Sequence, residues 1–202
     1  IINLCDLDTP FSLSGKTVLV TGASSGIGRA TAIECSRMGA DMIITGRNEE
    51  RLAATLSDLS GEGHRCLTCD LTVPEEVDRL VNEVGPVDGL VLCSGVGFML
   101  PFQFSSTKKL TDVMEANFLA PVELFRILAK KKKLNRGASV VALSSMGGTR
   151  FYTMGNGAYG ASKAALDSFM KFAARELAVK DIRVNTVLPA MIDTPLIHRG
   201  AV

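Results

Sequence analysis

The chain has 202 residues, which is the length of one domain or of two small ones. Its 22 basic and 21 acidic residues leave a net charge of +1, which excludes the electrostatic footprint expected for nucleic-acid binding. Five scattered cysteines do not indicate a disulfide framework. No apolar run approaches the ~20 residues of a membrane span, and residues 1–10 carry acids where a signal peptide carries bases. We therefore expect a cytoplasmic globular protein with no membrane and no nucleic-acid partner.

Short apolar segments alternate with stretches of helical spacing along the whole chain. The expected strands are residues 16–20, 41–45, 64–69, 88–93, 138–143 and 182–187, and the expected helices are residues 27–38, 49–59, 75–84, 107–132 and 158–179. Continuously apolar strands that alternate with helices are typical of a parallel sheet covered on both faces. No linker or low-complexity segment interrupts the pattern. The sequence predicts one doubly wound α/β domain over residues 1–202.

A glycine-rich turn follows the first expected strand and opens the first expected helix. Gly22, Gly26 and Gly28 have the spacing G-x-x-x-G-x-G, and Ser24, Ser25 and Ile27 fill the positions between them. Such a turn lets backbone amides approach a pyrophosphate at the positive end of a helix. A Walker phosphate loop is excluded because no Gly-Lys-Ser/Thr follows. The turn predicts dinucleotide binding, and a tight turn without a ligand is the alternative.

Later segments match the short-chain dehydrogenase/reductase family in order and spacing, so the chain resembles that family from about residue 13 onward. The matching segments are Asp70-Leu71 after the third expected strand, Asn117 in the long helix, Ser144-Ser145 after the fifth strand, Tyr159-x-x-x-Lys163, and residues 189–194. Within the family the sequence is most similar to the bacterial 3-oxoacyl-(acyl carrier protein) reductase type. The resemblance implies a Rossmann-type sheet with strand order 3-2-1-4-5-6. It also implies a nicotinamide cofactor.

The cofactor residues carried over from the family are Gly22, Ser24, Ser25, Gly26, Ile27, Gly28, Arg47, Asp70, Leu71, Gly95, Tyr159, Lys163, Pro189, Ile192 and Thr194. Gly46 stands where family members that prefer NAD carry an aspartate, and Arg47 follows it. Gly46 leaves room for a 2′-phosphate, and the planar guanidinium of Arg47 suits one. NADP(H) is therefore favoured over NAD(H). The alternative is that Arg47 is a solvated residue before the second helix.

Tyr159 and Lys163 are four residues apart in an expected helix, so they share one face. A free tyrosine has a pKa near 10, and a lysine ammonium ~4 Å away at an effective dielectric of ~20 supplies about 4 kcal/mol toward lowering it. The resemblance assigns proton transfer to Tyr159, polarisation of the substrate carbonyl to Ser145, and ribose binding and activation of Tyr159 to Lys163. It also implies that Asn117 holds a water that relays protons from Lys163. No metal is required.

The resemblance implies an oxidoreductase that interconverts a ketone and a secondary alcohol. The carbonyl substrate is expected to be a 3-oxoacyl thioester carried on acyl carrier protein or coenzyme A, and sugars, steroids and small diketones remain alternatives. Family members assemble through the helices that correspond to residues 107–132 and 158–179, which implies a homodimer or homotetramer. A non-catalytic dinucleotide-binding redox sensor is the alternative from another functional class.

The sequence departs from the family in two places. Leu92-Cys93-Ser94-Gly95 replaces the usual Asn-Asn-Ala-Gly, and Leu92 cannot make the hydrogen bonds with which the first Asn ties the central strands together. The chain also stops where a substrate-covering segment should begin. We therefore expect the family's seventh strand to be missing and this form to be a shortened one.

Two further patterns have competing interpretations. Cys66-Leu67-Thr68-Cys69 beside His64 suggests zinc, but without a second ligand pair buried thiols are the better interpretation. The apolar residues Phe98, Met99, Leu100, Phe102 and Phe104 belong either to the core or to the wall of a substrate cavity.

Overall fold

The computed structural model describes residues 11–97 and 99–199, so residues 1–10, Phe98 and residues 200–202 of the expected domain lie outside it. Its centre is a six-stranded sheet in which all neighbours are parallel, in the order β3-β2-β1-β4-β5-β6. The strands are β1 (Thr17–Thr21), β2 (Asp41–Gly46), β3 (Arg65–Thr68), β4 (Val87–Leu92), β5 (Leu134–Leu143) and β6 (Arg183–Val187). The expected strand order is confirmed.

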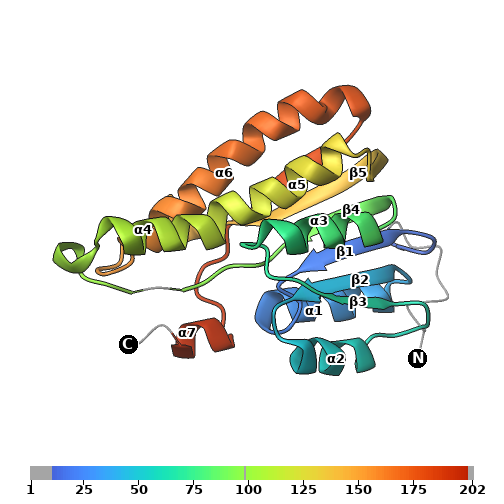
Figure 1. Ribbon diagram of the computed structural model, residues 1–202, viewed down its shortest axis with the longest axis horizontal. Helices are drawn as coiled ribbons and strands as arrows, with labels where there is room; N and C mark the ends of the chain where they lie inside the picture. Colours follow the sequence, from blue (N-terminus) through green and yellow to red (C-terminus); the bar gives the residue numbers. More distant parts are fainter. Residues whose placement is uncertain (1–10, 98, 200–202) are drawn as a thin grey trace.

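Helices cover both faces of this sheet (Figure 1). They are α1 (Gly26–Arg37), α2 (Glu49–Ser57), α3 (Pro74–Glu83), α4 (Thr107–Met114), α5 (Ala120–Lys130), α6 (Gly157–Leu177) and the short α7 (Pro195–Arg199). The first two lie on one face, and α3, α5 and α6 lie on the other. Within the described part of the chain, no helix is both long and apolar enough to cross a bilayer.

The strands are apolar on both sides because each face packs against helices. In β1, Leu19 belongs to the core beneath α3, α5 and α6, whereas Val18 and Val20 belong to the core beneath α1 and α2. This alternation within a continuously apolar strand is what a doubly covered parallel sheet requires.

The helix expected over residues 107–132 runs from Thr107 to Lys130 but is not α-helical throughout. A π-helical turn at Glu115–Leu119 separates α4 from α5. Pro121 explains the interruption, because it has no backbone N–H to donate to the carbonyl four residues earlier. The insertion changes the direction in which Asn117 projects relative to a regular helix.

Candidate functional site

Two adjoining cavities open where the carboxyl ends of β1, β4 and β5 meet. The glycine-turn cavity is lined by the turn after β1, the end of β2 and the loop after β3. The Tyr159 cavity is lined by the end of β5, the start of α6 and residues 189–197. Both cavities share Ile27, Cys93, Gly95, Thr194 and Leu196. They lie where the strand order reverses, between β1 and β4, which is the usual ligand position in an open α/β sheet.

The glycines of the turn make room for a close backbone approach. Gly22 has φ +65°, and a Cβ there would lie 2.8 Å from the backbone nitrogen of Ser94. A Cβ on Gly28 would lie 2.4 Å from the carbonyl oxygen of Gly22. Side chains are thus excluded where α1 begins, and Ser24, Ser25 and Ile27 line the same cavity. This cradle fits a pyrophosphate held by backbone amides at the start of a helix.

Thr21 ties β1 to the segment after β4. Its hydroxyl accepts hydrogen bonds from the backbone N–H groups of Cys93 (3.1 Å) and Ser94 (3.2 Å), and it donates to Ser94 Oγ at 3.3 Å. Leu92 is buried in the core beneath α3 and α5. Leu92, which cannot make the expected hydrogen bonds, therefore packs as an apolar side chain. The hydroxyl of Thr21 instead joins β1 to the segment after β4.

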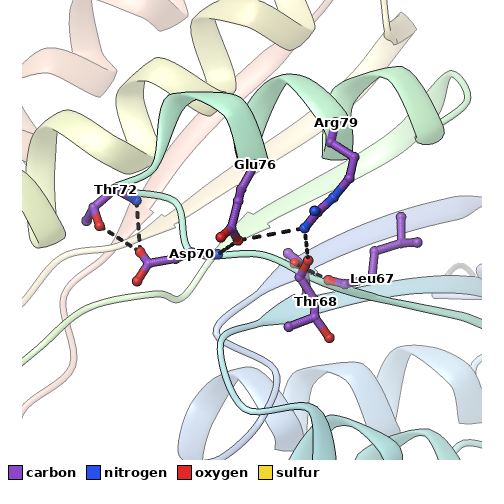
Figure 2. A network of polar contacts seen from close by, with 7 residues as sticks. Leu67, Thr68, Asp70, Thr72, Glu76 and Arg79 are labelled. Atoms are coloured by element: carbon purple, nitrogen blue, oxygen red, sulfur yellow. Dashed lines mark hydrogen bonds and ion pairs between the residues drawn. The ribbon is translucent and has the colours of Figure 1, made fainter.

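Beyond the end of β2, the glycine-turn cavity reaches Arg47, Asp70 and Leu71. Figure 2 shows how Asp70 is fixed in the loop that enters α3. Its Oδ1 accepts from the backbone N–H (3.0 Å) and hydroxyl (2.8 Å) of Thr72, and its own N–H donates to Glu76 Oε2 at 2.8 Å. Arg47 Nη1 lies 3.8 Å from Asp70 Oδ2. The structure thus brings together the residues expected to surround the adenosine end of a dinucleotide.

Sequence analysis missed Arg51, which lines the same end of the cavity as Arg47. The two residues are one helical turn apart, across the start of α2. Asn48 caps that helix, because its Oδ1 accepts from the N–H of Arg51 at 2.8 Å. The four-residue spacing between two arginines at a helix start was the signal that could have found it.

Ser145, Tyr159 and Lys163 all line the Tyr159 cavity. Ser145 follows β5 in an extended conformation, and the other two lie one turn apart on α6. The Tyr159 hydroxyl is hydrogen-bonded to Ser145. Lys163 Nζ lies 6.0 Å from the centre of the Tyr159 ring. The hydroxyl of the neighbouring Ser144 makes a different contact: it donates a hydrogen bond of 2.8 Å to the backbone carbonyl oxygen of Lys163.

Burial shifts the pKa values of Tyr159 and Lys163 in the directions that favour their neutral forms. It lowers the pKa of Lys163 to about 8. Burial also raises the pKa of Tyr159 above its usual value, and the hydrogen bond from Ser145 opposes this only in part. The net direction for Tyr159 is therefore opposite to the expected lowering, because removing the phenolate from water outweighs the opposing effect of Ser145. Stabilisation of the phenolate by Lys163 stays a prediction.

Asn117 lies behind the site, in the π-helical turn, and its side chain is fully buried. Its Oδ1 accepts from the N–H of Val96 at 2.7 Å, and its Nδ2 donates to the carbonyl of Val96 (3.0 Å) and to Ser162 Oγ (3.1 Å). A Cβ on Gly95 would lie 3.0 Å from Asn117 Oδ1 and 3.3 Å from Lys163 Nζ. Both side chains thus flank Gly95, and the water relay from Asn117 stays a prediction.

The sequence profile of the short chain dehydrogenase family matches residues 16–200. The chain belongs to this family. It is 35% identical to a 3-oxoacyl-(acyl carrier protein) reductase of Rickettsia bellii, over 91% of this chain and 76% of that protein. It is also 34% identical to mouse L-xylulose reductase, over 91% of this chain and 75% of the relative.

Solved structures of the short-chain dehydrogenase/reductase family have the same fold. A dehydrogenase/reductase from Sinorhizobium meliloti superposes with a TM-score of 0.85 at 32% identity, and the match covers 92% of this chain and 76% of that one. This family consists of oxidoreductases that use nicotinamide cofactors, and the glycine-turn cavity fits such a dinucleotide.

The exposure of side chains outside the central site bears on two further expectations, one for the apolar residues after β4 and one for the Cys66–Cys69 pair. Phe102 and Phe104 are exposed, so they do not belong to the core, whereas Met99 lines the Tyr159 cavity. Phe98 lies outside the described residues. Cys66 and Cys69 are free thiols whose pKa values are raised by burial. No group of residues suited to hold a metal ion occurs within residues 11–97 and 99–199.

Proposed function

We propose that this short-chain dehydrogenase/reductase is an NADP(H)-dependent oxidoreductase that interconverts a ketone and a secondary alcohol. One observation carries the proposal: the hydroxyls of Ser145 and Tyr159 and the ammonium of Lys163 line a cavity that shares its wall with the glycine-turn cleft. A proton donor, a carbonyl-polarising hydroxyl and a cation thus adjoin the place where a nicotinamide would be held.

The reaction divides among these side chains as follows. A bound nicotinamide supplies the hydride for reduction and accepts it in oxidation. Ser145 donates a hydrogen bond to the substrate carbonyl oxygen and polarises it. Tyr159 gives its proton to that oxygen as negative charge develops there. Lys163 stabilises the resulting phenolate by its positive charge, and Asn117 holds the loop that carries Gly95 against Lys163.

The preference for NADP(H) rests on the charge around Gly46. Arg47 and Arg51 both line the cavity at the end of β2, and Gly46 contributes no carboxylate there. Two guanidinium groups offer charge-assisted hydrogen bonds to a 2′-phosphate. Asp70 lies 3.8 Å from one of them, which leaves Arg51 as the cation not shared with that carboxylate.

The proposed substrate is a 3-oxoacyl thioester on acyl carrier protein or coenzyme A, in keeping with the reductase activity named for the Rickettsia relative. We further propose a homodimer or homotetramer. Phe169 and Phe172 on α6 support this proposal, because both rings are exposed on the helix that pairs with α4. A second copy of the chain would remove them from water.

The test is a titration of NADPH and NADH into the purified chain, followed by nicotinamide fluorescence, together with turnover of ethyl acetoacetate. Tighter binding of NADPH and measurable turnover are expected. Tyr159→Phe should keep the NADPH affinity and lose turnover about 10²–10⁴-fold. Unchanged turnover in this variant would remove Tyr159 as the proton donor. Binding without any turnover in the wild type would favour the redox-sensor alternative.

A further inference from the structure

The wall of the Tyr159 cavity is apolar beyond the reacting groups. Its largest side chains are those of Met99, Met146, Phe151, Met191, Ile192 and Leu196. Lys163 is the one charged side chain that lines this cavity in the described part of the chain, and it is buried. Among residues 11–97 and 99–199, the other hydroxyl and amide side chains that line this cavity, besides Ser145 and Tyr159, are those of Thr153, Asn156, Thr194 and the buried Ser144.

Backbone hydrogen bonds hold the segments of this wall together. The N–H of Leu100 donates to the carbonyl of Gly155 at 2.7 Å, which joins the loop of Met99 to the loop that follows Phe151. The N–H of Phe151 donates to Met146 O at 3.0 Å, and the N–H of Met146 donates to Pro189 O at 3.1 Å. The apolar wall is therefore built by fixed main-chain contacts rather than by isolated surface side chains.

Three side chains of the wall remain largely open to water. Met99 is 49% exposed, Phe151 57% and Met191 85%, and all three line the cavity that contains Tyr159. The nearest ionisable group of the segment after β6, Asp193, is engaged by His198 at 3.0 Å and does not line the cavity. An occupant that covers these three side chains gains from apolar contact, and Lys163, the charged side chain of the cavity, lies at the reacting end beside Tyr159.

We propose that the substrate carries an extended, uncharged apolar substituent on its ketone, which lies along Met99, Phe151 and Met191 while the carbonyl meets Ser145 and Tyr159. This inference rests on the proposed reductase activity and narrows its substrate class. It excludes polyhydroxylated ketones, whose hydroxyls would lose water where they cover Met99, Phe151 and Met191 and gain no hydrogen-bond partner from these three side chains. It also excludes ketones whose apolar substituent ends in a carboxylate.

The experiment measures kcat/KM with NADPH for straight-chain 2-ketones of four to ten carbons. Complete burial of one methylene corresponds to about fourfold in affinity, so half-burial predicts about a twofold rise in kcat/KM per carbon. The long 2-ketones should exceed ketones of equal length whose chain ends in a carboxylate by at least tenfold, and L-xylulose should be poorer than the long ketones. A flat series, or a preference for the sugar or the anion, would overturn the inference while leaving the reductase intact.

The double variant Met99→Ser/Phe151→Ser tests whether the apolar substituent lies against Met99 and Phe151. It should flatten the dependence of kcat/KM on chain length, because the ten-carbon ketone loses more contact with the wall than the four-carbon ketone does. Phe11→Ser is the matched control, because Phe11 is also exposed but lines neither cavity. An unchanged slope in the double variant would show that the apolar substituent lies elsewhere. No turnover of any ketone by the wild type would reject the reductase function and this inference together.

Discussion

The ammonium of Lys163 donates a hydrogen bond of 2.7 Å to the backbone carbonyl of Leu143, the last residue of β5. This contact joins α6 to the sheet beside the proposed catalytic hydroxyls. It is the one hydrogen bond of the ammonium to another described residue, and it does not replace the solvation that the group has in water, as the lowered pKa of Lys163 indicates. Burial of the Lys163 ammonium at the site therefore lowers the stability of the folded state.

Lys163→Met should raise the free energy of unfolding at pH 7 by about 1–3 kcal/mol while abolishing turnover. The shift of the Lys163 pKa from 10.5 to about 8 corresponds to about 3 kcal/mol, from which the loss of the bond to Leu143 subtracts about 1 kcal/mol. Denaturant unfolding at fixed pH measures the change. Lys171→Met is the matched control on the same helix, because Lys171 is exposed and pairs with Asp167.

The same substitution predicts a pH dependence of known sign. Below pH 8 Lys163 is protonated in both the folded and the unfolded state, so the cost of burying its charge is present in full. Between pH 8 and 10.5 the folded protein releases the proton and the unfolded chain keeps it, so the cost is progressively lost. The stability advantage of Lys163→Met should therefore shrink as the pH rises from 8 to 10. An advantage that is constant across this range would contradict the explanation.

Asn117→Ala should destabilise the protein by about 2–4 kcal/mol. The change leaves the half-buried N–H and carbonyl of Val96 without their partner and opens a cavity in the π-helical turn. Ser162→Ala removes one hydrogen bond to Asn117 and should cost about 1 kcal/mol. Thermal unfolding of both variants measures the difference. Equal, small effects would show that Asn117 does not hold the loop after β4, and would leave the water relay as its remaining role.

The doubly wound α/β class could be predicted because it depends on local patterns, and the strand order and most of the site followed from the family resemblance. Continuous apolar strands indicate a doubly covered sheet, and the glycine turn and the Tyr159–Lys163 spacing place their residues at its carboxyl edge. The direction of the Tyr159 pKa could not be predicted, because it depends on how far α6 and its neighbours bury the phenol. The π-helical turn was missed because helical periodicity on both sides of it outweighed the signal from Pro121.

Arg47→Ala and Arg51→Ala should each lower the affinity for NADPH about 10- to 100-fold and change that for NADH less than twofold. Each guanidinium that contacts a phosphate contributes about 1.5–3 kcal/mol, and NADH has no 2′-phosphate to lose. Fluorescence titration with both cofactors separates the two effects. Arg79→Ala is the control, because Arg79 contacts Thr68 and Glu76 outside the cavity (Figure 2). An equal loss of affinity for NADPH and for NADH would show that the two arginines have a structural role instead.

Thr21→Val should weaken cofactor binding as well as stability. Valine keeps the shape of threonine but leaves the N–H groups of Cys93 and Ser94 without their acceptor, which costs about 2–3 kcal/mol. Because Ser94 and Gly95 line the glycine-turn cavity, we expect the dissociation constant for NADPH to rise about three- to tenfold. Ser36→Ala is the control, since Ser36 is also buried and bonds to Ile33 and Ser60 at the far end of α1. It should lower the melting temperature and leave the NADPH affinity unchanged. If both variants lose stability and neither loses affinity, the tie between β1 and β4 supports the fold without positioning the cofactor.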